Sequence, residues 1–358
     1  MTVPKFDMRE LEVVGRVPAI FGEPIAVYNY PAAPVQAYKA MFDRRPIWQI
    51  AGGETGMFNP RIIPDNIARA LVFEAETVPP EECGGEDMFG VQWEYMPQSM
   101  GSMVRPGNPL LSDANEWYDK VIWPDVDSWD WKGCAERNAG RLDKNKYNTT
   151  MLFSGWFERL ISFMDFEGAI MALVDDDQKP AVKELFERLS GVYIEIIDKF
   201  IEFFPELDGF CIHDDWGGQK DTFFSPEVVR EMIVPAMQKV TEHIHGRGRQ
   251  CDLHSCGRII KQTPNIIAAG WDSWIPQEMN DTHKIYELYG DKLIIAVIPE
   301  PFDPDALSEE EQRARAREFA EKFCNPGKPC TLSHYMAHML TPAFREELYM
   351  RSRLRFGG

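Results

Sequence analysis

The feature that most constrains the fold is a regular alternation that begins near residue 149. Short, nearly continuous apolar runs alternate with longer segments in which apolar residues recur at helical spacing. Strands that are apolar on both faces are typical of parallel sheets covered by helices, so the pattern predicts an α/β fold. The predicted strands are residues 149–154, 208–213, 250–254, 272–275, 292–298 and 329–334.

The count of strands indicates how the sheet is completed. A seventh strand is predicted at residues 46–51, and an eighth within residues 88–105, a segment that also alternates like a β-hairpin. No glycine-rich dinucleotide fingerprint follows the first strand, which argues against an open nucleotide-binding sheet. We therefore predict a (β/α)8 TIM barrel over residues 44–358, preceded by an N-terminal extension at residues 1–43.

The charge of the chain excludes several classes of partner. The net charge is −19, without a cluster of lysine and arginine, so neither nucleic acid nor a membrane surface is expected as a partner. No apolar run approaches the length of about 18 residues that a membrane span needs. Residues 1–10 lack the apolar core of a secretory signal, and the seven cysteines are scattered and odd in number. We expect a cytoplasmic protein with reduced thiols.

Polar residues with ligand or acid–base chemistry recur where the predicted strands end. In a (β/α)8 barrel the carboxyl ends of the strands meet at one mouth, where the active site lies. A random arrangement would scatter such residues over both ends, so the pattern predicts a catalytic site there. The residues at these ends are Glu54, His213, Asp214, Asp215, His254, Cys256, Gln277, Glu278, Glu300 and His334.

His254 and Cys256 are the strongest metal candidates. Residues two apart on an extended segment point to the same side, so an imidazole and a thiol project together. This pair supplies two of the three protein ligands of a catalytic zinc site, and the alternative is a buried thiol beside a structural histidine. The third ligand stays open between His334, Cys330 and Glu300, with His334 nearer the end of its strand than Cys330.

The acidic residues at the strand ends are the candidates for proton transfer. Asp214 and Asp215 follow His213 directly, where they are expected to act as general acid or base or to orient a histidine. The alternative is a turn, in which aspartate is common. Glu54 follows the predicted first strand and joins this group of catalytic candidates.

Several segments together resemble the uroporphyrinogen decarboxylase superfamily. The resemblance covers roughly residues 45–355 and implies a (β/α)8 barrel with its site at the C-terminal mouth. The matching segments are Leu-Phe-Ser-Gly at 152–155, Asp-Asp-Trp-Gly at 214–217, Ser-Pro-Glu at 225–227, Leu-His-Ser-Cys-Gly at 253–257, Leu-Ser-His at 332–334 and Thr-Pro at 341–342.

The resemblance also separates two branches of that superfamily. True porphyrinogen decarboxylases carry an Arg-Gln-Ala-Gly-Arg segment whose arginines hold substrate carboxylates, whereas residues 48–54 here read Trp-Gln-Ile-Ala-Gly-Gly-Glu, without arginine. The chain is more similar to the cobalamin-dependent methyltransferases, which bind zinc through a His-x-Cys pair and a later cysteine. His254 and Cys256 match the pair, while the later cysteine has no clean counterpart: His334 is near its place and Cys330 lies a few residues earlier.

The resemblance to the cobalamin-dependent methyltransferases implies a specific reaction. We expect a zinc-assisted methyltransferase that moves a methyl group between a small substrate and a corrinoid carried on a partner protein. Residues 58–66 resemble O-demethylases from anaerobes, which suggests a methyl ether donor, with aromatic ethers among the candidates, and the resemblance also suggests a homodimer. The alternatives are a decarboxylase or lyase of a small substrate, and a binding barrel without catalysis.

Overall fold

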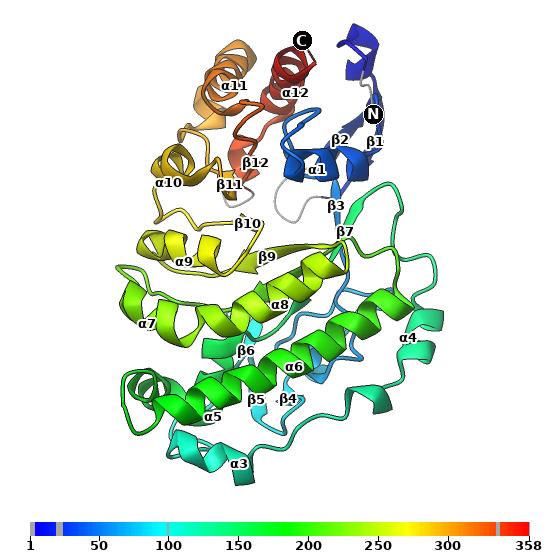
Figure 1. Ribbon diagram of the computed structural model, residues 1–358. Coiled ribbons are helices and arrows are strands. Elements are labelled where there is room, and N and C mark those ends of the chain that lie inside the picture. The colour runs from blue at the N-terminus through cyan, green and yellow to red at the C-terminus, as the bar shows by residue number, and fades with distance from the viewer. Residues whose placement is uncertain (1–3, 19–23, 99, 334–336, 358) are drawn as a thin grey trace. The chain divides into compact units, whose positions relative to one another are not determined.

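The protein is described by a computed structural model that covers residues 4–18, 24–98, 100–333 and 337–357 (Figure 1). It divides into two compact units. The first unit comprises the described residues of Met1–Gly56, Lys144–Tyr147 and Asp272–Gly358, and the second comprises those of Met57–Asp143 and Asn148–Trp271.

The first unit joins the N-terminal and C-terminal parts of the chain. Strands β10, β11 and β12 pair in parallel, in the order β12-β11-β10, while β1 and β2 form a separate antiparallel pair. Helices α11 and α12 pack against each other. The elements are η1 (Met8–Leu11), β1 (Val13–Val17), β2 (Ile25–Tyr28), α1 (Pro34–Phe42), β10 (Ser273–Trp274), α10 (Thr282–Tyr289), β11 (Ile294–Val297), η6 (Pro304–Ala306), α11 (Glu309–Phe323), β12 (Thr331–Leu332), η7 (Ala337–Met339) and α12 (Pro342–Phe356).

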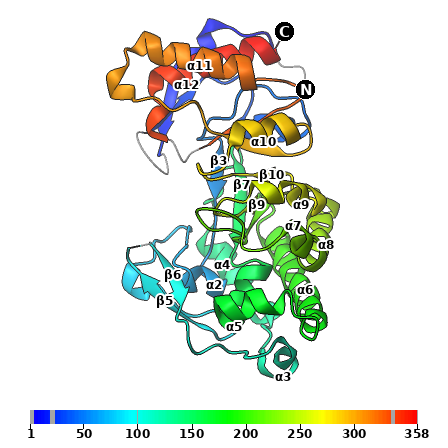
Figure 2. The same cartoon turned by 90° about the vertical axis from the view of Figure 1, so that its left-hand side faces the viewer.

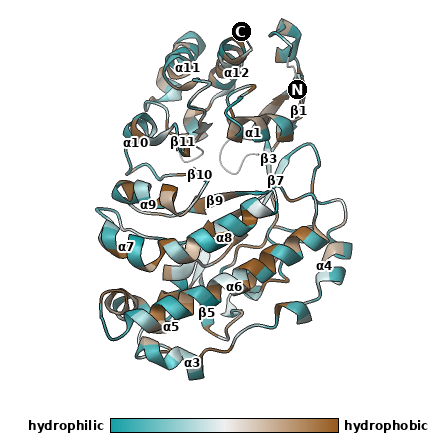
Figure 3. Cartoon of the chain, viewed as in Figure 1, coloured by the Kyte–Doolittle hydropathy of each residue, from teal (hydrophilic) through white to brown (hydrophobic). Residues whose placement is uncertain are grey.

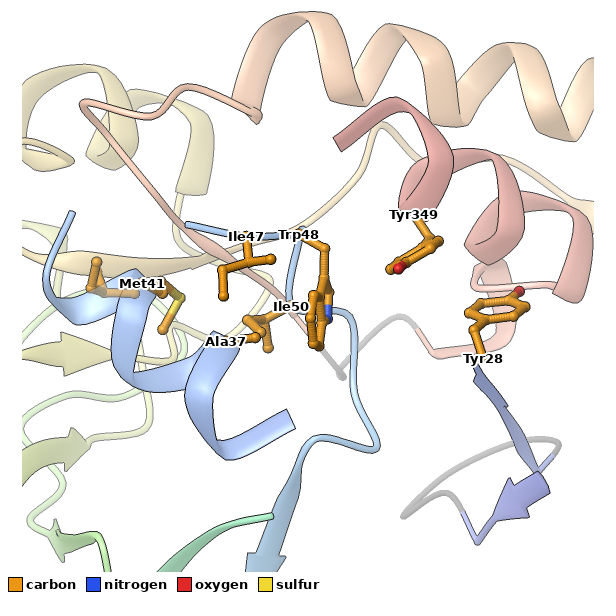
Figure 4. Packing of buried hydrophobic residues seen from close by; sticks show 8 residues of the cluster. Tyr28, Ala37, Met41, Ile47, Trp48, Ile50 and Tyr349 are labelled. Carbon is orange, nitrogen blue, oxygen red and sulfur yellow. The ribbon is translucent and has the colours of Figure 1, made fainter. Parts of the chain in front are cut away.

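Residues from both ends of the chain build the core of this unit. Figure 4 shows Trp48 beside Ile47 and Ile50, with Tyr349 of α12 and Tyr28 of β2 nearby. The Tyr28 and Tyr349 rings stack with centroids 5.3 Å apart, which joins the N-terminal segment to the C-terminal helix. The N-terminal residues are therefore part of a packed core.

Residues 46–51 do not form the predicted strand. They are irregular, with a single parallel bridge between Ile50 and Thr331. The backbone N–H of Gln49 donates to the Ser352 hydroxyl at 2.9 Å instead of to a neighbouring strand. The apolar pattern of this segment reflects its place in the core rather than a continuous ladder of hydrogen bonds.

The second unit carries three parallel strands and the longest helices. Strands β7, β8 and β9 pair in parallel in that order, and Phe58, just after β3, donates to Thr149 of β7 at 2.9 Å. β3 (Thr55–Met57) spans the boundary between the units, and the first residue of β7 belongs to the first unit. The other elements are α2 (Pro64–Ala68), η2 (Pro80–Glu82), β4 (Gly85–Glu86), β5 (Gln92–Met96), β6 (Gly101–Val104), η3 (Ala114–Glu116), α3 (Trp117–Lys120), η4 (Val126–Ser128), α4 (Trp131–Arg137), β7 (Tyr147–Leu152), α5 (Trp156–Ala172), α6 (Lys179–Phe203), β8 (Gly209–His213), α7 (Pro226–Met232), α8 (Val234–Gly246), β9 (Gln250–His254), η5 (Ile260–Gln262) and α9 (Thr263–Ala268).

Helices of the second unit cover its parallel strands with apolar faces. Helix α6 packs against α5 and α8, and α8 packs against β9 (Figures 1 and 2). Figure 3 shows apolar and polar residues alternating along α6 and α8, as expected for helices with one buried face. Helix α5 is interrupted at Asp165, whose φ of 60° is not helical.

The segment 88–105 forms the predicted hairpin but not an eighth barrel strand. β5 and β6 pair antiparallel, and β4 pairs antiparallel with β5, which makes a separate three-stranded sheet. Alternating polar and apolar residues suit a sheet with one solvated face, whereas a parallel barrel strand is apolar on both. The hairpin prediction is confirmed, and the barrel-strand prediction for this segment is wrong.

Parallel strands followed by helices in both units give the predicted α/β fold of the (β/α)8 TIM-barrel type. None of the described helices is both long enough and apolar enough to cross a membrane.

A candidate metal centre at the ends of two parallel strands

Two histidines stand side by side at the ends of neighbouring strands in the second unit. His213 ends β8 and His254 ends β9, and the two residues are partners in the parallel register. Their rings stack with centroids 4.8 Å apart and an angle of 13° between the planes. The register therefore brings together two imidazoles from residues 41 positions apart in the sequence.

The next alternate residue on each chain segment adds a second potential ligand. Cys256 follows His254 and places Sγ 3.3 Å from His254 Nε2, while Asp215 follows His213 and places Oδ1 3.7 Å from His213 Nε2. The Cys256 backbone N–H donates to Asp215 Oδ1 at 2.6 Å. Each of the four side chains offers a ligand atom within 4.8 Å of the others. Two imidazoles, a thiol and a carboxylate are a donor set that suits zinc.

The turns that follow Asp215 and Cys256 are in close contact with each other. Gly257 has a φ of 84°, and a Cβ there would lie 2.1 Å from the carbonyl oxygen of Gly217. The Arg258 N–H donates to the Gly218 carbonyl at 2.8 Å. Only glycine tolerates both this φ and this contact, so the close crossing fixes the Cys256 segment against the segment that carries Asp215.

Glu158 controls which nitrogen of His213 faces the cluster. It lies in the first turn of α5, and its Oε2 is 2.5 Å from His213 Nδ1. Burial opposes ionisation of Glu158, but the charges of His213 and Arg69 outweigh it and lower its pKa to about 2. In the neutral imidazole that a metal requires, the ionised carboxylate favours the proton on Nδ1, which leaves Nε2 as the electron-pair donor toward the other three side chains.

Asp214 points away from the cluster and holds α5 in place. Its Oδ1 accepts from the Glu158 N–H at 2.9 Å, and its Oδ2 accepts from Trp216 Nε1 at 2.9 Å and from the Phe157 N–H at 3.3 Å. Burial raises the pKa of Asp214 to about 7, although these donors act in the opposite direction. A Cβ on Gly155 would lie 2.4 Å from Asp214 Cβ, so this contact is close. The geometry makes Asp214 a cap that positions Glu158.

Among the other residues predicted for the site, those that the structure describes are not part of this cluster. Glu54 is buried in the first unit, where its Oε1 accepts from Trp48 Nε1 at 3.3 Å and burial raises its pKa. Cys330 is buried in the same unit, with Sγ 3.8 Å from the Phe323 carbonyl oxygen. Glu300 is exposed in that unit, 3.3 Å from His283 Nδ1, and His334 falls outside the described residues.

Two residues of this site were not predicted from the sequence. Glu158 and Arg69 come from α5 and from the residue after α2, away from the strand ends on which the sequence argument relied. Arg69 lies 3.7 Å from Glu158. A carboxylate in the first turn of a helix that follows a strand directly was the available signal for Glu158. Arg69 carried no comparable signal.

The fold has a counterpart among solved structures. It resembles a methyltransferase from Methanosarcina mazei with a TM-score of 0.57, over 91% of this chain and 100% of that chain. The two sequences are 13% identical, so the likeness establishes a shared fold. No family model matches the sequence, and no curated protein matches it.

Proposed function

We propose that the protein is a zinc-assisted methyltransferase that moves a methyl group between a small methyl ether and a corrinoid protein. The observation that carries this proposal is the cluster of His213, His254, Cys256 and Asp215 within one unit. The fold shared with a methyltransferase supports it, as does the sequence resemblance to the cobalamin-dependent branch of the uroporphyrinogen decarboxylase superfamily.

The donor set fits a catalytic metal. Catalytic zinc takes three protein ligands and leaves one position for the substrate, and we assign His213, His254 and Cys256 to it. His213 thus takes the place of the third ligand that the sequence left open. Zinc held there would polarise the ether oxygen of the substrate.

The surrounding residues have distinct tasks. Glu158 orients His213, and Asp214 orients Glu158 through the N-terminus of α5. Asp215 is the carboxyl group beside the cluster, and burial raises its pKa, which suits a residue that gives a proton to the departing oxygen. The corrinoid partner would receive the methyl group as the oxygen takes this proton.

The proposal is tested with the purified protein and a reduced corrinoid protein. We expect about one zinc per chain and methylation of the corrinoid by at least one methyl ether, read from the absorbance change of the cobalt centre. The donors would be aromatic and aliphatic methyl ethers. A protein that retains no metal even after incubation with zinc, or that methylates the corrinoid from none of these donors, would contradict the proposal.

Glu158 offers a test of the arrangement around His213. Glu158→Gln keeps a hydrogen-bonding group but removes the charge that favours the proton on Nδ1. We expect zinc affinity to fall about 10–100-fold, as for other partners that orient a ligating histidine. Competition with a chromophoric chelator measures it, and Glu184→Gln, which removes an exposed carboxylate that accepts from Tyr118, is the matched control. Unchanged zinc affinity in Glu158→Gln would contradict this role.

A further inference from the structure

Arg69 is a nearly buried cation beside the candidate metal centre. Its guanidinium carbon lies 5.0 Å from the centroid of the Trp93 ring and 5.9 Å from that of the Phe153 ring. Its side chain is 15% exposed, so it is largely withdrawn from solvent. The residue is placed by the end of α2, where Ala70 adopts a φ of 64°.

The hydrogen-bonding capacity of Arg69 is mostly unused within the described part of the chain. One guanidinium nitrogen donates to the Ser154 hydroxyl at 3.2 Å, and another lies 3.7 Å from Glu158 Oε1, beyond hydrogen-bonding distance. The other oxygen of Glu158 contacts His213 at 2.5 Å. By contrast, the buried Arg159 hydrogen-bonds two carboxylates. Arg69 therefore keeps donors available that a purely structural arginine uses.

The charge of Arg69 acts on the candidate metal centre. Burial raises the pKa of both Asp215 and Cys256, and the positive charge of Arg69 works against that rise in each. Glu158 connects the two sites, because one of its oxygens faces Arg69 and the other faces His213. Arg69 is therefore linked to the candidate metal centre through Glu158.

We propose that Arg69 binds a carboxylate of the substrate, so that the methyl donor is a small methyl ether that carries a carboxylate group. Contact with the two aromatic rings restricts the orientation of the guanidinium. Its planar group can then form two parallel hydrogen bonds to a carboxylate. This inference rests on the proposed function for the position of the reacting oxygen, and it adds the chemical class of the substrate.

The test compares acids with neutral partners of similar shape. The pairs are 4-methoxybenzoate with 4-methoxybenzyl alcohol, and methoxyacetate with 2-methoxyethanol, titrated calorimetrically into the zinc-loaded full chain without corrinoid protein. We expect at least one acid to bind about tenfold or more tightly than its neutral partner, as for a hydrogen bond to a charged group. Arg69→Gln should abolish the preference, and Arg69→Lys should restore part of it because lysine keeps the charge without the fork.

The control removes a similar arginine elsewhere in the second unit. Arg188 also lies over a tryptophan, with its guanidinium 4.5 Å from the Trp123 ring centroid, and Arg188→Gln should keep the full preference for acids. Equal binding of acid and alcohol in both pairs by the wild type overturns the proposal whether or not the variants fold. A preference that survives in Arg69→Gln overturns it as well.

The outcomes also separate this inference from the proposed function. Acids that bind through Arg69 in a protein that takes up no zinc would leave the carboxylate site standing and the methyltransferase proposal failing. Methyl transfer from neutral ethers, without any preference for acids in binding, would leave the methyltransferase proposal standing and contradict the carboxylate site.

Discussion

Replacing His254 by alanine should remove the metal and with it the methyl-transfer activity. The variant deletes one of three nitrogen and sulfur donors that the register of β8 and β9 brings together. Loss of a ligand should lower zinc affinity by more than the roughly 10–100-fold expected for loss of a residue that only orients one. Elemental analysis of the purified variant and the rate of corrinoid methylation measure the two effects.

Cysteine variants provide the comparison that identifies the ligand set. Cys256→Ala should lose zinc as His254→Ala does, whereas Cys330→Ala should keep it, because the Cys330 thiol contacts Phe323 within the first unit. Cys83→Ala removes a partly exposed thiol of the second unit and controls for nonspecific zinc binding by cysteine. Retention of a full zinc complement by His254→Ala would exclude this residue as a ligand, and loss of zinc from Cys330→Ala would return that cysteine to the ligand set.

Much of the fold was predictable because local signals agreed with the final packing. The Ser225 hydroxyl accepts from the Val228 N–H and caps α7, and Thr341 caps α12 in the same way, each followed by proline at the first helical position. The predicted parallel strands follow from apolar runs, which need no knowledge of distant residues. The segment 46–51 carries the same apolar signal without forming a strand, since its Gln49 N–H bonds to the distant Ser352.

The candidate site was predictable only in part, for a geometric reason. The period of a strand places His254 with Cys256, and it places His213 with Asp215. It does not reveal that His213 and His254 are register partners, because the pairing of two strands depends on the whole sheet. The same period puts Asp214 on the opposite side from Asp215: Asp214 caps α5, and Asp215 accepts from the Cys256 backbone.

The position of Trp93 beside Arg69 depends on a second buried arginine. The Arg159 side chain is fully buried and forms ion pairs with Asp65 and Asp87, the second at 2.6 Å. The same Asp87 oxygen accepts from Trp93 Nε1 at 2.9 Å, and its other oxygen accepts from the Phe89 N–H. Through the Asp87–Arg159 ion pair, this network holds the segment before β5 against α5, next to Glu158.

Replacing Arg159 by methionine should therefore destabilise the protein strongly. The change leaves two buried carboxylates without their cation, and breaking a buried pair in this way costs about 3–5 kcal/mol. Urea unfolding followed by tryptophan fluorescence measures the loss, and Arg188→Met, at an exposed arginine that lies over Trp123, should cost at most about 1 kcal/mol. Adding Asp65→Asn and Asp87→Asn to Arg159→Met should recover part of the stability, because the uncompensated charges are removed. An Arg159→Met variant as stable as Arg188→Met would show that the network contributes little, and the placement of Trp93 beside Arg69 would then need another cause.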